Sequence, residues 1–151
     1  MRFLMVDKIY DLEPGIRITA SKRLSAQEEL FRDHFPGFPV VPGVLLTEMM
    51  AQAAGKCLNS QGTRSGLAIL ARINSAAFRE WVRPEEEAII FARIKQERQE
   101  FAVADCWIEV NGRKACSAEL FFVFAPRQQF APNYTDEILD AYLRQENGAA
   151  S

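Results

Sequence analysis

Residues 43–59 predict the longest helix of this chain, and this helix is apolar on almost every side. Three of its polar residues, Glu48, Gln52 and Lys56, are spaced four apart and therefore lie on one face. A helix with so little polar surface has to be surrounded by protein. We therefore expect a central helix wrapped by the rest of the chain. One small curved sheet gives limited cover, so we also expect a second subunit to complete it.

A stiff, irregular loop is expected directly before this helix. Residues 35–43 hold three prolines and two glycines in nine positions. Proline has no N–H donor for a strand ladder and stops a preceding helix. The helix is therefore expected to begin at Pro42-Gly43 and to end near Asn59, before Gly62.

The remaining segments are typical of β-strands. Six are expected, at residues 3–10, 16–24, 66–73, 87–95, 101–110 and 114–124. Pro14-Gly15 predicts a type II turn between the first two, and Asn111-Gly112 predicts a hairpin between the last two. One buried helix with antiparallel strands around it is an α+β fold.

The chain changes character after Pro126. Asn133 or Thr135 is expected to cap a short helix over residues 136–146, followed by a frayed tail at 148–151. We therefore divide the chain into a domain at 1–125 and a C-terminal extension at 126–151.

Composition excludes several classes of protein. The 151 residues are 48% apolar and 25% charged, as in a single globular domain. Eighteen basic and twenty acidic residues give a net charge of −2, which argues against a nucleic-acid binder. No uncharged run is long enough to span a membrane, and the N-terminus lacks the apolar core of a signal peptide.

The chain has three cysteines and a single histidine, His34. The cysteines are odd in number, form no C-x-x-C pair and lie in apolar runs (Cys57, Cys106 and Cys116). They are typical of reduced core thiols in a cytoplasmic protein. With one histidine, no metal site is expected.

Two ionisable residues are candidates for chemistry. His34 immediately precedes the proline-rich loop, and Glu48 lies one turn into the apolar helix. A carboxyl group that burial keeps protonated, paired with a neutral imidazole, can act as general acid and general base near neutral pH. Gly43 begins the helix, where a free backbone N–H can hold a developing oxyanion. This combination suits removal of a proton next to a carbonyl, with loss or gain of a β group.

The amino-acid sequence of this segment resembles the signature of a known family. From His34 to Gly55 it reads HFPGFPVVPGVLLTEMMAQAAG. It closely matches the HFPG-x-P-x-x-PGV-x-x-x-E-x-x-AQ-A-x-G pattern of the (3R)-hydroxyacyl-acyl-carrier-protein dehydratases of fatty-acid synthesis. The resemblance extends over about four fifths of the chain, through Leu4-Met5-Val6-Asp7, Val82-Arg83-Pro84 and the final hairpin to Phe124.

The resemblance implies a hot-dog fold, in which a bent antiparallel sheet wraps a long helix, and a homodimer or larger oligomer with active sites between subunits. His34 would take the C2 proton, and Glu48 of the opposite subunit would protonate the leaving hydroxyl. The Gly43 amide would hold the thioester oxygen, and Gln52 would orient Glu48. The substrate would be a 3-hydroxyacyl chain on the phosphopantetheine of acyl carrier protein, with no further cofactor.

The chain departs from the family pattern in places. Pro84-Glu85-Glu86 stands where the family usually has Pro-Gly-Asp, and Ala77-Phe78 stands where it has Arg-Phe. The resemblance implies that the carrier protein docks on basic residues near the mouth of the tunnel. The candidates in this chain are Arg72, Arg79 and Arg83, with solvated surface arginines as the alternative.

Other functions remain open at this point. The same base and acid could isomerise a trans-2 to a cis-3 double bond. A further alternative is a hot-dog thioesterase. Another is a non-catalytic subunit that pairs with a second chain in a fatty-acid, polyketide or polyene complex. Acyl chain length is also open.

Overall fold

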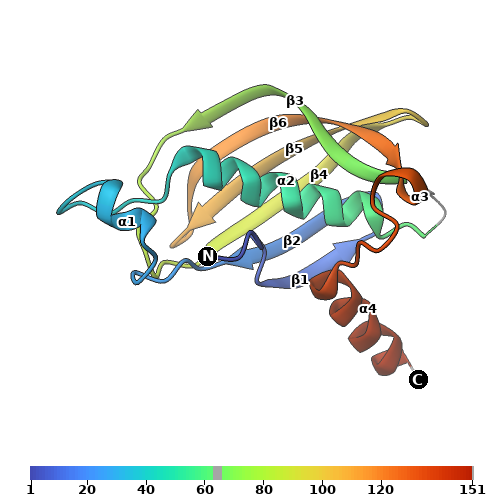
Figure 1. Cartoon of the computed structure of the whole chain (residues 1–151), viewed down its shortest axis with the longest axis horizontal. Helices are drawn as coiled ribbons and strands as arrows, with labels where there is room; N and C mark the ends of the chain where they lie inside the picture. Colours follow the sequence, from blue (N-terminus) through green and yellow to red (C-terminus); the bar gives the residue numbers. More distant parts are fainter. Residues whose placement is uncertain (63–65, 151) are drawn as a thin grey trace.

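The computed structural model describes residues 1–62 and 66–150. Six antiparallel strands form one sheet that curls around a central helix, α2, with a small helix at one end of the sheet and two at the other (Figure 1). The strands are β1 (Lys8–Glu13), β2 (Arg17–Lys22), β3 (Gly66–Phe78), β4 (Ala88–Glu97), β5 (Phe101–Val110) and β6 (Arg113–Pro126). The helices are α1 (Leu30–Asp33), α2 (Gly43–Asn59), α3 (Arg127–Phe130) and α4 (Glu137–Ala150). The predicted α+β class is confirmed.

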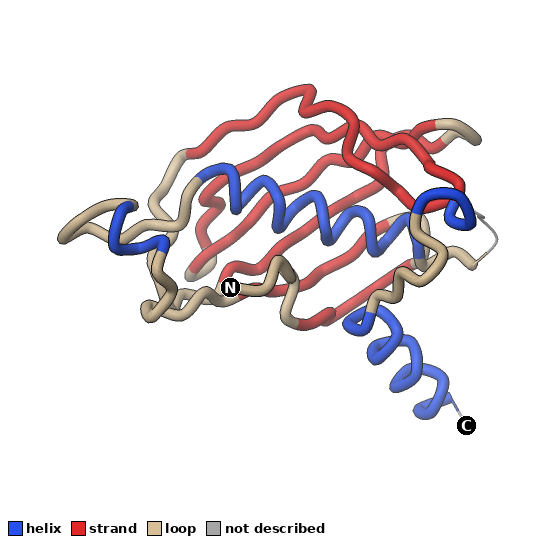
Figure 2. Tube along the Cα trace, in the orientation of Figure 1, coloured by secondary structure: helices blue, strands red, loops and turns tan. Residues whose placement is uncertain are grey.

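The strand order across the sheet is β1-β2-β4-β5-β6-β3 (Figure 2). Both predicted turns are present. The Ile16 N–H donates to Glu13 O across Pro14-Gly15, with Gly15 at φ +72°. Asn111 and Gly112 both have positive φ between β5 and β6, as a two-residue hairpin with right-handed twist requires. β3 lies at one edge of the sheet and pairs with β6.

The core lies between α2 and the concave face of the sheet. The helix contributes the buried side chains Leu46, Met49, Met50, Ala53, Ala54, Cys57 and Leu58. Opposite them lie Ile90, Ile108, Leu120 and Phe122, with alanines such as Ala92, Ala104 and Ala118 between. Small residues at alternate strand positions let a curved sheet approach the helix closely while the interior stays densely packed.

The helix is incompletely covered within one chain. Val44 in its first turn is 78% exposed. The polar face with Glu48 and Gln52 is half-buried, and it points away from the sheet. This limited cover agrees with the expectation for one small sheet, because the sheet wraps one side of α2 and leaves the other open (Figure 1).

The N-terminal strand differs from the sequence prediction. Strand β1 begins at Lys8 rather than at residue 3. The preceding residues cross α2 and use their backbone groups elsewhere. The Met5 N–H donates to Gln52 Oε1, and the Phe3 carbonyl accepts from Gln52 Nε2. The helix thus supplies hydrogen-bond partners that a neighbouring strand would otherwise supply.

The C-terminal extension contains two helices. The predicted short helix is present as α4, which starts at Glu137 and continues to Ala150, beyond the predicted end. Its first turn is capped by Asp136, whose Oδ1 accepts the Leu139 N–H at 3.0 Å, rather than by Asn133 or Thr135. Leu139 is buried. The α4 helix packs beside β1. The division of the chain into a domain at 1–125 and an extension at 126–151 stays a prediction.

Across the described ranges, 1–62 and 66–150, no helix is long and apolar enough to cross a bilayer.

Candidate active site

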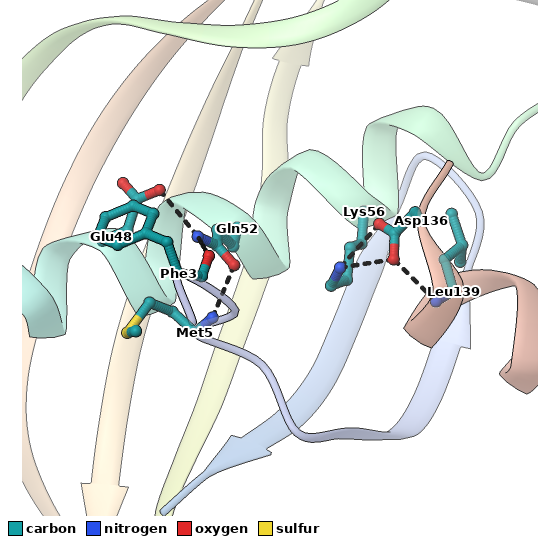
Figure 3. A network of polar contacts seen from close by, with 7 residues as sticks. All are labelled: Phe3, Met5, Glu48, Gln52, Lys56, Asp136 and Leu139. Atoms are coloured by element: carbon teal, nitrogen blue, oxygen red, sulfur yellow. Dashed lines mark hydrogen bonds and ion pairs between the residues drawn. The ribbon is translucent and has the colours of Figure 1, made fainter. Parts of the chain in front are cut away.

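Glu48 and Gln52 form a hydrogen-bonded pair on the open side of α2 (Figure 3). Gln52 Nε2 donates to Glu48 Oε1 at 3.0 Å and to the Phe3 carbonyl at 3.1 Å. Its Oε1 accepts the Met5 N–H at 2.8 Å. Because both amide hydrogens and the amide oxygen are engaged, the side chain of Gln52 is fixed, and it holds the Glu48 carboxyl group in one orientation.

A cavity of about 540 Å³ opens along this face of the helix. The helix contributes every third or fourth residue to its wall, as expected for one face. The lining from α2 comprises Glu48, Ala51, Gln52, Gly55, Lys56 and Asn59. Strands β3 and β6 add Ala68, Ile69, Leu70 and Phe122, while Arg2, Phe3 and Leu4 close a second side. The cavity is therefore large enough for a small organic ligand and has a carboxyl group at its wall.

The C-terminal extension closes the far end of this cavity. The Nζ of Lys56 lies 2.8 and 2.7 Å from the two carboxylate oxygens of Asp136, and both side chains are at most 10% exposed (Figure 3). Tyr134, Thr135 and Glu137 also line the cavity here. From the sequence, Lys56 is expected on the polar stripe, but its partner is not evident there. A lysine in an otherwise apolar helix was the available signal, because a buried ammonium group needs a counter-charge.

His34 follows the short helix α1 and is held by the proline-rich loop. Its backbone N–H donates to Leu30 O, and its carbonyl accepts the Val40 N–H. The imidazole Nδ1 lies 3.0 Å from the Val40 carbonyl oxygen. A carbonyl only accepts, so this contact places the proton on Nδ1 and leaves Nε2 with a free lone pair. The ring also stacks on Phe35 at 4.0 Å between centroids.

Gly43 is the first residue of α2, as expected. Its N–H belongs to the first turn, where backbone donors have no partner within the helix. A Cβ at this position would lie 3.2 Å from the Phe78 ring, so glycine allows β3 to approach the helix start. The Gly43 carbonyl accepts from Thr47 Oγ1 at 2.9 Å, which anchors the first turn.

The three arginines are exposed and lie in different surroundings. Arg83 stacks over the Phe38 ring at 4.7 Å, next to the proline-rich loop. Arg79 donates to Ser117 Oγ, just after β3. Arg72 lies within β3, donates to Asn74 Oδ1 and stacks over Phe121. Arg83 is thus beside the loop that carries His34, whereas Arg72 is bound to the sheet.

The single chain does not bring all predicted site residues together. Among the described residues, those lining the cavity include Glu48 and Gln52 but not His34 or Gly43. Helix α1, which His34 follows directly, lies beyond the N-terminal end of α2, and residues 35–42 connect the two (Figure 1). An active site that combines His34 with Glu48 would therefore be expected to need a second subunit.

The three thiols are free and buried, as predicted. Burial raises the pKa of Cys57 and of Cys116 to about 11, and it raises the pKa of Cys106 further still. Such thiols stay protonated at neutral pH and are poor nucleophiles. In the described part of the chain, no group of three or more potential metal-ligating side chains is present.

Solved structures share this architecture. A hypothetical thioesterase with coenzyme A from Streptococcus pneumoniae superposes with a TM-score of 0.63 at 12% identity, over 79% of this chain and 88% of that chain. The dehydratase heterocomplex ApeI:P from Xenorhabdus doucetiae gives a TM-score of 0.59 at 15% identity, over 78% and 97%. At such identities the likeness concerns the fold alone, and it defines the class: the chain is a hot-dog-fold protein.

Sequence comparisons define the family within that class. A FabA-like domain matches residues 1–119. The 3-hydroxyacyl-acyl-carrier-protein dehydratase FabZ of Levilactobacillus brevis is 38% identical over 81% of this chain and 83% of its own length. FabZ of Listeria innocua is 34% identical over 84% and 89%. The chain belongs to the FabA-like family of 3-hydroxyacyl-acyl-carrier-protein dehydratases.

Proposed function

We propose that this protein dehydrates 3-hydroxyacyl thioesters carried on acyl carrier protein to trans-2-enoyl thioesters. The observation that carries the proposal is the Gln52–Glu48 pair on the wall of an open cavity, in a chain related to FabZ over most of its length. Gln52 aims a carboxyl group into a space that can hold the substrate.

The reaction needs one base, one acid and one oxyanion donor. His34 Nε2 removes a proton from C2, and the electron pair forms the C2–C3 double bond. The C3–O bond breaks while Glu48 protonates the departing hydroxyl, which leaves as water. The Gly43 N–H stabilises the thioester oxygen as negative charge develops on it. The thioester itself acidifies the C2 proton, so the proposed chemistry needs no metal or dissociable cofactor.

The proposed tautomer of His34 fits the role of base. The Val40 carbonyl keeps the proton on Nδ1, so Nε2 accepts the substrate proton and the resulting imidazolium retains its hydrogen bond to Val40. Glu48 then returns to its starting state by exchange of a proton with His34 through water.

We further propose that two copies of the chain build each active site, with His34 from one and Glu48 from the other. The cavity beside Glu48 is open. Strand β3 is an edge strand, and Val44, Ile73 and Phe78 near it are at least 48% exposed. Exposed apolar side chains along an unpaired edge favour association with a second copy.

Acyl carrier protein is the proposed macromolecular partner. Arg83 is the strongest candidate for contact, because it lies against Phe38 of the loop that follows His34. Arg79 and Arg72 are further candidates, and both are bound to groups of the sheet. A cytoplasmic location remains a prediction from the sequence.

The direct test is to incubate the purified protein with 3-hydroxyacyl carrier protein and follow the absorbance of the conjugated enoyl thioester. We expect turnover by the native chain and loss of turnover in His34→Ala and Glu48→Gln. A free-thiol assay run in parallel detects thioester hydrolysis. Release of free thiol without formation of the enoyl thioester would contradict dehydration and would show that the protein is a thioesterase.

A further inference from the structure

The cavity beside Glu48 has a pair of polar side chains at each end along the helix. Glu48 and Gln52 lie at one end, and Lys56 with Asp136 lies at the other (Figure 3). The wall also contains apolar side chains: Leu4, Ala51, Ile69, Leu70 and Phe122. The residues from Glu48 to Lys56 advance by about 12 Å along the helix axis. The space therefore has a reactive end and a charged end, with apolar side chains in its wall.

Gly55 keeps the middle of this space open. It lies in the interior of α2, where glycine is less favourable than alanine. A Cβ added at Gly55 would meet no described atom within 4 Å apart from its chain neighbours and its own helix backbone. Its φ is not in the left-handed region, so the backbone does not require glycine. The missing side chain instead leaves volume in the cavity, between Gln52 and Lys56.

The charged end is rigid because it joins two helices. Lys56 extends from α2, and Asp136 precedes α4. The Asp136 carboxylate binds both the Lys56 ammonium and the Leu139 N–H, while Leu139 is itself buried. Separating this pair, or placing hydrocarbon against it, is unfavourable because both groups are charged. An aliphatic chain that reaches the Lys56–Asp136 pair would make no favourable contact by extending further.

We propose that residues 134–137 of the C-terminal extension form the end wall of this acyl-binding space, so that the Lys56–Asp136 pair limits the length of the acyl chain that the enzyme accepts. The inference rests on the proposed dehydratase activity and adds its substrate class: chains short enough to end before the pair. Gly55 and Tyr134 are then residues that determine specificity.

The test compares kcat/KM for 3-hydroxybutyryl, 3-hydroxyoctanoyl and 3-hydroxypalmitoyl carrier protein. In K56M/D136S the pair is removed together, methionine replaces the length of lysine, and serine keeps a helix cap for α4. We expect the palmitoyl-to-butyryl ratio of kcat/KM to rise by about tenfold or more relative to the native chain. Tyr134 is exposed and lies outside the core, so Tyr134→Ala should fold even if the double variant does not. We expect Tyr134→Ala to raise the palmitoyl-to-butyryl ratio of kcat/KM by less than the double variant does.

Gly55→Leu tests the space from the other direction. Leucine fills the middle, so the octanoyl-to-butyryl ratio should fall by about tenfold or more. If the ratios of kcat/KM stay at the native value in all three variants, the proposed end wall is contradicted, while the proposed dehydration still stands. A Gly55→Leu variant that slows every substrate equally would also overturn it, because the space would then hold the pantetheine arm or the partner subunit. A native chain inactive with every substrate would overturn both proposals.

Discussion

The side-chain amide of Gln52 donates to the Glu48 carboxylate at 3.0 Å while its oxygen accepts the Met5 N–H at 2.8 Å. One residue thus couples the proposed acid to the N-terminal segment. The pairing follows from the i, i+4 spacing on a helix, where the two side chains are neighbours.

Replacing Gln52 by leucine should lower kcat with little change in KM. The loss is expected to be about tenfold or more, a part of the 10²–10⁴ that a general acid supplies. Because Gln52 acts through Glu48, the pH–rate profile of kcat should also change shape, which a purely structural defect would not cause. Steady-state kinetics over a range of pH checks this. An unchanged profile with reduced stability would assign Gln52 a structural role only.

Mixing two inactive variants should restore activity if the active site is shared between subunits. Co-expressed His34→Ala and Glu48→Gln chains would form mixed dimers in which one of two sites carries both intact residues. With random pairing, about a quarter of the native activity should return. Each variant expressed alone is the control. Absence of recovery, with mixed dimers confirmed by differential tagging, would show that His34 and Glu48 act within one chain.

Breaking the Lys56–Asp136 pair on one side should destabilise the fold strongly. Lys56→Met leaves a carboxylate that is 10% exposed without its counter-charge, at an expected cost of roughly 3–5 kcal/mol. In K56M/D136S no charge is left unpaired, so most of that loss should be recovered. Urea unfolding of the native chain and both variants measures the difference. Equal destabilisation by the single and the double change would contradict the assignment of the cost to an unpaired charge.

Stability should decline at alkaline pH because of the buried thiols. Burial raises the pKa of Cys57 and Cys116 from the ordinary 9.0 to about 11. Above pH 9 the unfolded chain loses these protons first, so the free energy of unfolding falls as pH rises towards 11, by at most roughly 3 kcal/mol per thiol. Unfolding midpoints measured below pH 9 and near pH 11 check the slope. Cys57→Ala should reduce it, and a slope that Cys57→Ala leaves unaltered would contradict this cause.

Much of the architecture was predictable because it is encoded locally. The central helix shows its own periodicity, Pro36, Pro39 and Pro42 prevent regular structure before it, and Asn111-Gly112 specifies a hairpin by backbone conformation alone. Strand limits were less predictable. Residues 3–7 have an apolar pattern suited to a strand, yet Phe3 and Met5 bind Gln52, a partner 47 or more positions away.

The sequence by itself determined the candidate chemistry: an imidazole and a carboxyl group fourteen residues apart, joined by a loop and helix start of defined composition. Only the tertiary structure decided what surrounds the carboxyl group. Lys56 and Asp136 are 80 positions apart, and their pairing depends on how the chain after β6 folds back onto α2. Local patterns report which face of an element is polar, because that depends on neighbours in sequence. They do not report which distant charge meets that face, because that depends on how the elements pack.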